Sequence, residues 1–194
     1  MCNLYTQTKS VDEVARLFRE LQMPLSFPDG LPNLEPREIA ITDPCPIVRA
    51  DKSGGFDLVV RRWSWPAPGG KPVFNFRSDG REFGGSGRCL IVADSFFEFS
   101  RPDDPKARRK HKWRFTLRDA DQFAIAGLWR TDATVGEAFT MLTTEPGEDI
   151  QPYHNRQIVV LPPSYFARWL DPAVPAAQLC RPLPAGSLSV EQVC

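Results

Sequence analysis

Short runs of branched and aromatic residues dominate the hydrophobic pattern after residue 45, and clusters of Gly, Pro and Asp separate these runs. Runs of this length and composition are typical of β-strands. We predict strands at residues 46–50, 56–61, 89–93, 96–99, 113–117, 123–126, 139–143 and 158–161. The pattern therefore predicts a mainly β (α+β) domain whose curled, barrel-like sheet carries a few peripheral helices.

Helical signals are confined to two places. Residues 10–13 have the form of a capping box, and hydrophobic residues then recur at helical spacing, which predicts a helix over about 11–22. A second, short helix is expected over 163–170, with Pro at its start. Residues 23–46 are rich in Pro and lack periodicity, so we expect a long ordered connection there. The tail from about residue 172 is also rich in Pro and shows no pattern.

Composition narrows the class of protein. The chain has 194 residues, of which 42% are hydrophobic, and we expect one domain over residues 2–194. It contains five Cys, none in a CxxC pair, and two His, so we expect no metal site and no cofactor. We see no secretory leader or apolar membrane span, and we therefore expect a soluble, cytoplasmic, bacterial-type monomer that does not contact a membrane. The formal net charge is zero, so any affinity for DNA must come from local patches.

Cys2 is a candidate nucleophile because of its position. Removal of Met1 would leave a terminal amine and a thiol on the same residue. The α-amine has an ordinary pKa of about 7.7–8.0, so part of it is neutral at pH 7 and able to condense with an aldehyde. The thiol can close onto the same carbon and form a thiazolidine ring. The alternative is a chain that begins Met-Cys by chance and carries an inert thiol.

Four internal residues form the next group of candidates. His154 stands where a loop enters a predicted strand, a common place for site residues, and the other interpretation is a partly buried structural His. Glu98 shares a strand face with Phe96, so it is either a solubility device on an edge strand or a desolvated acid with a raised pKa. Asn75 and Arg77 follow a hydrophobic stretch and suit a neutral hydrogen bond and a phosphate contact, or simply a polar turn.

Aromatic residues beside basic ones suggest a surface for nucleic acid. Trp63 and Trp65 follow Arg61 and Arg62, an arrangement in which indole rings stack on bases while guanidinium groups meet phosphates. Packing in the core is the other common role of Trp. The basic run 106–114 is typical of a solvated loop or of a segment that binds the nucleic-acid backbone.

Taken in order, these motifs resemble the SRAP (SOS response-associated peptidase) family, whose members crosslink to abasic sites in single-stranded DNA. The resemblance extends from residue 2 to about residue 171. Its motifs are Cys2-Asn3-Leu4-Tyr5, Trp63-Ser64-Trp65, Asn75-Phe76-Arg77-Ser78-Asp79, Asp94-Ser95-Phe96-Phe97-Glu98-Phe99, Ala126-Gly127-Leu128-Trp129, Leu142-Thr143-Thr144 and His154-Asn155-Arg156.

The resemblance implies a role for each reactive residue. Cys2 would form a thiazolidine with the aldehyde of a ring-opened abasic sugar, and Asn75 would hold the chain terminus or the sugar. Glu98 would shuttle protons to the leaving hydroxyl and back to the thiol, while His154 would protonate the sugar ring oxygen. The family name also implies that the chain cleaves after its own Met1, a step that ordinary aminopeptidases would replace.

The same resemblance implies contacts to DNA. Arg77 and Arg156 would bind phosphates on either side of the lesion, and Trp63 or Trp65 would stack on a neighbouring base. The sequence departs from the family pattern at Asn3 and Leu4, which replace Gly and Arg, at Gln157-Ile158, which replaces Met-Pro, and at Asp79, which replaces Glu. These departures affect the expected contacts to DNA and leave the four reactive residues in place.

Two other classes of function fit the same residues. One is a non-catalytic module that binds single-stranded or modified DNA. The other is a thiol hydrolase with Cys, His and Glu. Blocking the mature terminal amine distinguishes them, because only the crosslinking protein requires that amine.

Overall fold

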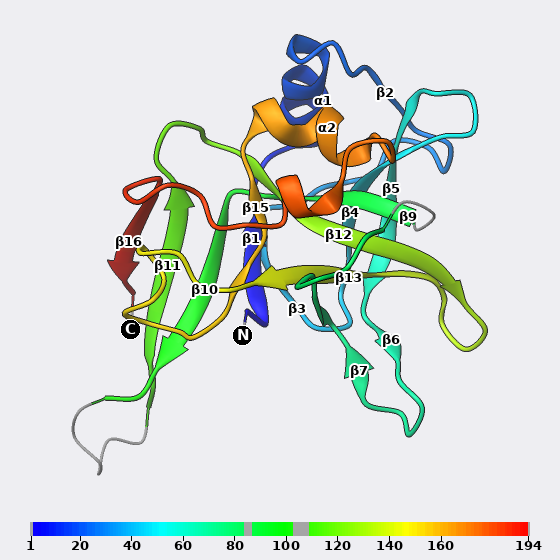
Figure 1. The fold of residues 1–194 in the computed structure, drawn as a ribbon. Coiled ribbons are helices and arrows are strands. Elements are labelled where there is room, and N and C mark those ends of the chain that lie inside the picture. The colour runs from blue at the N-terminus through cyan, green and yellow to red at the C-terminus, as the bar shows by residue number, and fades with distance from the viewer. Residues whose placement is uncertain (1, 84–86, 103–108, 194) are drawn as a thin grey trace.

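The computed structural model describes residues 2–83, 87–102 and 109–193, and its largest feature is a closed β-barrel (Figure 1). The barrel strands follow one another in the order β13-β12-β9-β4-β5, and β5 also pairs in parallel with β13, which closes the ring. These strands are β4 (Pro44–Ala50), β5 (Phe56–Trp63), β9 (Gly87–Ala93), β12 (Phe123–Asp132) and β13 (Gly136–Thr144).

A second sheet of five strands lies beside the barrel. Its order is β16-β11-β10-β1-β3, and all its pairings are antiparallel. The chain passes from barrel strand β9 into β10 through the single residue Asp94. The strands of this sheet are β1 (Leu4–Gln7), β3 (Arg37–Ala40), β10 (Ser95–Ser100), β11 (His111–Leu117) and β16 (Leu188–Gln192).

Short strands extend the barrel sheet or form a hairpin of their own. Strand β8 pairs in parallel with β13, which places Asn75 opposite Met141 and Arg77 opposite Thr143. Strands β6 and β7 form a separate hairpin. The short strands are β2 (Leu25–Ser26), β6 (Trp65–Pro66), β7 (Pro72–Val73), β8 (Asn75–Arg77), β14 (Gln157–Ile158) and β15 (Val160–Leu161).

Two hydrophobic clusters hold these layers together. One contains Cys2 and joins the barrel interior to the inner face of the five-stranded sheet, where Phe96 stacks on Phe115 at 5.1 Å between ring centroids. The other contains Phe18 and Phe166 and joins the outside of the barrel to the helices. Alternation along each barrel strand sends successive side chains to these two cores, so both faces of the barrel are apolar.

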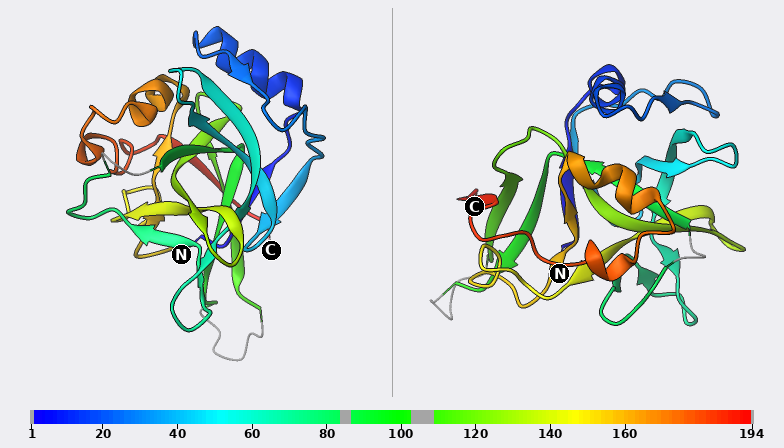
Figure 2. Two further views of the ribbon diagram at one scale, coloured as in Figure 1. Left: turned by 90° about the vertical axis from the view of Figure 1, so that its right-hand side faces the viewer. Right: turned by 45° about the horizontal axis from the view of Figure 1, so that its top comes forward.

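Helices cover one side of the barrel (Figures 1 and 2). Helix α1 (Val11–Glu20) begins with the predicted capping box, because the Ser10 hydroxyl accepts from the Glu13 N–H and the Glu13 carboxylate accepts from the Ser10 N–H. Helix α2 (Phe166–Leu170) follows the 3₁₀ turn η1 (Pro163–Tyr165), and a second such turn, η2 (Ala176–Gln178), lies further along the chain.

The mainly β architecture and both helices are confirmed, as are the predicted strands, except that residues 158–161 belong to two short strands, β14 and β15, instead of one. The interpretation of 23–46 as a connection is wrong in part, because β2, β3 and the start of β4 lie within it. Strand β3 buries only Ile39, so it carries almost no hydrophobic signal. The tail after residue 171 likewise contains β16, which pairs with β11. Part of the basic run, residues 106–108, lies outside the described residues.

Candidate active site around Cys2

Cys2 is buried at the start of the chain, just before β1, with 1% of its surface exposed. The Asn75 side chain holds it from β8, because Nδ2 donates a 2.8 Å hydrogen bond to the Cys2 carbonyl oxygen. The Cys2 thiol donates to the Leu4 carbonyl oxygen at 3.3 Å. Two of the four predicted reactive residues are therefore in direct contact, and Asn75 positions the residue that carries the predicted nucleophile.

Glu98 approaches Cys2 from β10, the central strand of the five-stranded sheet. Its side chain is 1% exposed, and the backbone N–H of Cys2 donates a hydrogen bond to its carboxylate. Burial raises the pKa of Glu98 to about 7, and the bond from Cys2 lowers it by a smaller amount. Of the two interpretations from sequence, the structure supports the desolvated acid, since β10 is not an edge strand.

The same burial keeps the Cys2 thiol protonated. Desolvation and, to a smaller extent, the negative charge of Glu98 together raise the pKa of the thiol to about 12, while hydrogen bonds with the backbone of Leu4 and Phe97 act in the opposite direction. A thiol in this state is a poor nucleophile until a base removes its proton. The backbone nitrogen of Cys2, in contrast, already touches a carboxylate whose pKa is near neutrality.

His154 completes the group from the loop before β14. Its Nε2 lies 4.0 Å from a carboxylate oxygen of Glu98, and burial lowers the pKa of the ring. The neighbouring Tyr153 ring packs against Trp113 of β11 at 4.6 Å between centroids. Trp113 is the cross-strand partner of Glu98, so this contact holds the loop beside the carboxylate.

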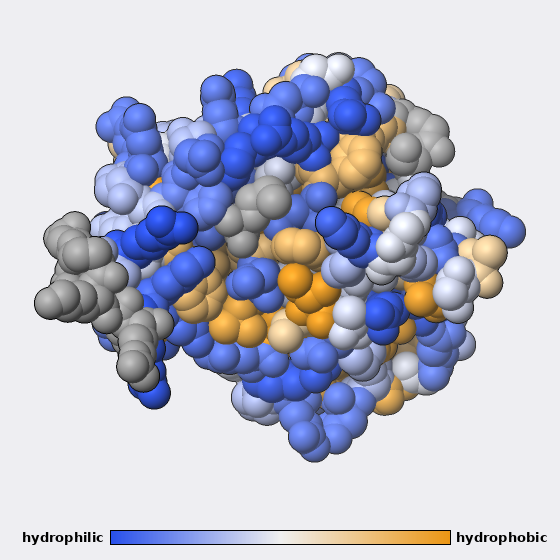
Figure 3. Space-filling view, turned by 90° about the horizontal axis from the view of Figure 1, so that it is seen from below, coloured by the Kyte–Doolittle hydropathy of each residue, from blue (hydrophilic) through white to orange (hydrophobic). Residues whose placement is uncertain are grey.

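A pocket of about 290 Å³ opens over Glu98 and His154. Asn3, Phe99 and Lys110 form the rest of its lining, and sequence reasoning did not select any of these three. Lys110 belongs to the basic run, which was the one signal that could have pointed to it. Figure 3 views the molecule from below, the side where β1 begins, and shows hydrophobic side chains gathered at the centre inside a hydrophilic border.

The family model for SOS response associated peptidase (SRAP) matches residues 1–194. The chain belongs to the SRAP family. Its relatives include the abasic site processing proteins YobE and YoaM of Bacillus subtilis strain 168, with 38% identity over 92 residues and 36% over 91. Each match covers 45% of this chain, and the matched parts span 41% and 39% of the length of those relatives.

Solved structures share the fold of this SRAP protein. A protein of Bacteroides thetaiotaomicron has a TM-score of 0.73 at 16% identity, with 100% of this chain and 92% of that chain covered. A phage-related protein of Bordetella bronchiseptica has a TM-score of 0.73 at 21% identity, with coverage of 99% and 94%. At these identities the likeness establishes the fold, a single domain of the SRAP type.

The two arginines predicted to bind phosphate differ in their surroundings. Arg77, at the end of β8, is exposed to solvent. Arg156 is 13% exposed, and both of its terminal nitrogens bond to the Asp79 carboxylate, at 3.1 and 2.7 Å. Asp79 responds with a lowered pKa, chiefly because of this hydrogen bonding. The SRAP structure therefore leaves Arg77 accessible, whereas Arg156 is already paired within the protein.

The expectation of an exposed tryptophan platform is corrected by the structure. Trp63 is 0% exposed, and its indole N–H donates to the Phe74 carbonyl oxygen at 2.9 Å, so its ring belongs to the core. Trp65 is 7% exposed, and the Arg130 guanidinium lies 4.3 Å from its ring centroid. The prediction that Trp63 stacks on a base is wrong, and stacking by Trp65 would require Arg130 to move.

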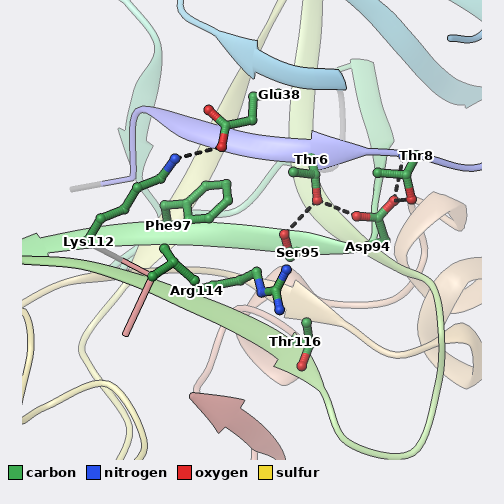
Figure 4. A pocket seen from close by; sticks show the side chains of 10 residues that line it. Thr6, Thr8, Glu38, Asp94, Ser95, Phe97, Lys112, Arg114 and Thr116 are labelled. Carbon is green, nitrogen blue, oxygen red and sulfur yellow. Dashed lines mark hydrogen bonds and ion pairs between the residues drawn. The ribbon is translucent and has the colours of Figure 1, made fainter. Parts of the chain in front are cut away.

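A larger pocket, of about 750 Å³, lies on the opposite face of the five-stranded sheet (Figure 4). There Asp94 accepts hydrogen bonds from Thr6 and Thr8, and Lys112 pairs with Glu38 at 2.6 Å above the ring of Phe97. These contacts tie β1, β3, β10 and β11 together. The charged side chains drawn there are occupied in pairing the strands, so we place the chemistry in the smaller pocket over Glu98.

Within residues 2–83, 87–102 and 109–193, no group of three or more His, Cys, Asp or Glu side chains is arranged to hold a metal ion. Over the same ranges, none of the helices has both the length and the apolar character needed to cross a bilayer.

Proposed function

We propose that this SRAP protein bonds covalently, through Cys2, to the ring-opened aldehyde of an abasic site in single-stranded DNA. The observation that carries the proposal is the hydrogen bond from the backbone nitrogen of Cys2 to Glu98, a buried carboxyl whose pKa is about 7. Removal of Met1 turns that nitrogen into a primary amine beside a proton acceptor. The names of the Bacillus relatives, abasic site processing proteins, support the choice of substrate.

The proposed reaction joins an aminothiol to an aldehyde with the loss of one water molecule. The Cys2 amine attacks C1′ of the open sugar and gives a carbinolamine, whose hydroxyl leaves as water to form a Schiff base. The Cys2 sulfur then adds to the same carbon, and the thiol proton passes to the nitrogen. The product is a thiazolidine that links the chain terminus to the sugar, a stable covalent adduct.

Each neighbouring side chain has a task in this sequence. His154 donates the proton to the ring oxygen as the closed sugar opens, and Glu98 protonates the leaving hydroxyl. Glu98 as carboxylate then takes the proton from the thiol, a step that is needed because the pKa of the Cys2 thiol is about 12. Asn75 holds the Cys2 carbonyl so that amine and thiol face the same carbon. Exposed Arg77 binds a phosphate next to the lesion.

The raised pKa of the Cys2 thiol disfavours a second candidate function, a thiol hydrolase. Hydrolases with a Cys nucleophile rely on a thiolate formed at neutral pH by a lowered pKa, whereas burial here raises the pKa of the Cys2 thiol. In the proposed reaction the amine attacks the aldehyde first, so this first step does not require a thiolate. The third class, a protein that only binds DNA, has no use for a buried carboxyl next to the backbone nitrogen of Cys2.

Intact mass spectrometry tests the proposal. The purified protein should weigh less by one methionine residue, and incubation with single-stranded DNA containing an abasic site should yield a heat-stable adduct. Cys2→Ala keeps the amine, so it should give an adduct only when borohydride reduces the Schiff base. Cys180→Ala, which changes a partly buried thiol elsewhere, is the matched control and should behave as the parent. A heat-stable adduct of Cys2→Ala without borohydride would refute the thiazolidine.

A further inference from the structure

The Arg156 side chain is fixed by four hydrogen bonds. Besides the two bonds to Asp79, its Nη2 donates to the carbonyl oxygen of Thr143 at 2.9 Å and to the hydroxyl of Thr143 at 3.1 Å. Asp79 is half exposed and comes two residues after β8. A bidentate pair of this kind sets direction as well as distance, because the guanidinium is planar.

The Arg156 backbone, in turn, contacts the ring of His154. The Arg156 N–H and the Arg156 carbonyl oxygen each lie 3.0 Å from Nδ1. A neutral ring with its hydrogen on Nε2 accepts from the N–H, and a ring protonated on Nδ1 donates to the carbonyl oxygen. One placement of the Arg156 backbone therefore satisfies Nδ1 in both charge states, and Nε2 stays directed at Glu98 without any rotation of the ring.

We infer that Asp79 is a positioning residue, which holds the Arg156 side chain so that the Arg156 backbone keeps His154 Nε2 facing Glu98. This inference rests on the proposed function and extends it beyond the reactive residues. Asp79 touches neither the reacting atoms nor the pocket, so its effect passes through Arg156. It also gives Arg156 a role within the protein's own structure, through its bonds to Asp79 and Thr143.

Strand β8 and the residues after it place both sides of the site. Asn75 at its start holds the Cys2 carbonyl, and Asp79 beyond its end holds Arg156. Between them the Ser78 N–H and hydroxyl both bond to the carbonyl oxygen of Thr143, at 2.9 and 2.8 Å. The segment 75–79 is thereby held against β13, and it contacts residues on both sides of the site.

A kinetic experiment distinguishes positioning from phosphate binding. Asp79→Asn should lower the maximal single-turnover rate of adduct formation about ten-fold, the scale expected for a small misplacement, and change the half-saturating DNA concentration less than about two-fold. Asp79→Glu, which can still pair with Arg156, should recover most of the rate. If Arg156 serves as a phosphate ligand, Asp79→Asn frees it, so DNA binds more tightly at an unchanged maximal rate, and the inference is overturned.

A matched control is available in the barrel. Asp29 is exposed to a similar degree as Asp79, 55% against 49%, and pairs with Arg61 at 2.6 Å. Asp29→Asn breaks an ion pair of similar exposure away from the site, where Arg61 keeps its bond to Glu137, and should leave both kinetic parameters unchanged. A loss of rate as large as that of Asp79→Asn would mean that broken ion pairs act through general destabilisation, which would refute the positioning role.

A second measurement needs neither DNA nor activity. The chain has only two His, so the ¹⁵N imidazole signals of the full-length protein can be assigned with His111→Gln. At pH 8 the neutral His154 ring should carry its hydrogen on Nε2, and Asp79→Asn should convert it to a mixture of the two tautomers. An unchanged tautomer would overturn the positioning role, whereas failure of the proposed function would show as the absence of an adduct in the unsubstituted protein.

Discussion

Glu98→Gln should stabilise the folded protein, and the gain should grow with pH. The parent carboxyl is 1% exposed, and its pKa rises from the ordinary 4.5 to about 7 on folding because burial disfavours the charged form. A folded-state pKa above the unfolded value means that the folded chain binds more protons between these values. The contribution of Glu98 to stability is thus fully present below pH 4.5 and is lost as the pH rises through about 7. Glutamine has nearly the same shape and no charge to bury.

The size of the effect follows from the same two pKa values. The interval from 4.5 to about 7, at 1.36 kcal/mol for each pH unit, corresponds to about 3 kcal/mol. The free energy of unfolding of Glu98→Gln, relative to the parent protein, should therefore increase by up to about 3 kcal/mol between pH 4.5 and pH 8. Any constant difference in packing or hydrogen bonding between Glu and Gln cancels in this comparison across pH. For a chain of this size, each kcal/mol shifts Tm by about 2–4 °C.

Urea unfolding at pH 5, 6, 7 and 8 measures this difference directly, with Glu145→Gln, a change at an exposed carboxyl, as the control. The control should differ from the parent by the same amount at every pH. The titration of His154 is common to parent and variant, so its contribution largely cancels. A stability difference for Glu98→Gln that stays constant from pH 5 to pH 8 would refute the buried, neutral-range carboxyl. In the crosslinking assay the same variant should be slower by about 10²–10⁴-fold, so stability and activity should change in opposite directions.

Two further outcomes test the DNA surface and a strained backbone position directly after β5. Arg77→Ala should weaken binding of single-stranded DNA and reduce the salt dependence of log K by about one unit of slope, and an unchanged slope would remove Arg77 from the phosphate path. Ser64→Gly should raise stability by about 1–2 kcal/mol, because Ser64 has φ of 88° and a hydroxyl that is buried without a hydrogen-bond partner among the described residues. Ser64→Ala removes the hydroxyl and keeps the unfavourable φ, so it should be less stable than Ser64→Gly in the same thermal melts; equal stability would argue against backbone strain.

The sequence predicted those elements whose residues bury a strongly hydrophobic face. Barrel strands β9 and β12 are buried on both faces and stand out as continuous apolar runs. Helix α1 was predictable from its cap and its spacing, which are local signals. Strands β3 and β16 escaped prediction because they lie at the two edges of the second sheet, where most side chains face solvent. Their pairing is decided by neighbours far away in the sequence.

Trp63 shows where a local pattern misleads. Beside Arg61 and Arg62 it resembles part of a basic, aromatic surface, but the barrel closes at this point through the parallel pairing of β5 with β13. Closure turns Trp63 into the interior, where Tyr5 packs edge-on against its ring. No residue near Trp63 in the sequence carries information about that pairing, since β13 begins more than seventy residues later.

The sequence predicts which residues form the candidate site, but it does not predict their contacts, their burial or their pKa values. Cys2, Asn75, Glu98 and His154 come from four distant segments, and their contacts form only when the second sheet closes against the barrel. The pKa of Glu98 depends on that closure, because burial is the main cause of its rise. An acid that is half ionised near pH 7 can both give and take a proton, which is what condensation of an amine and a thiol with one aldehyde requires. The chemistry proposed for Cys2 is thus a property of the fold, and a variant that loosens the packing of β10 should lose it even with all four residues intact.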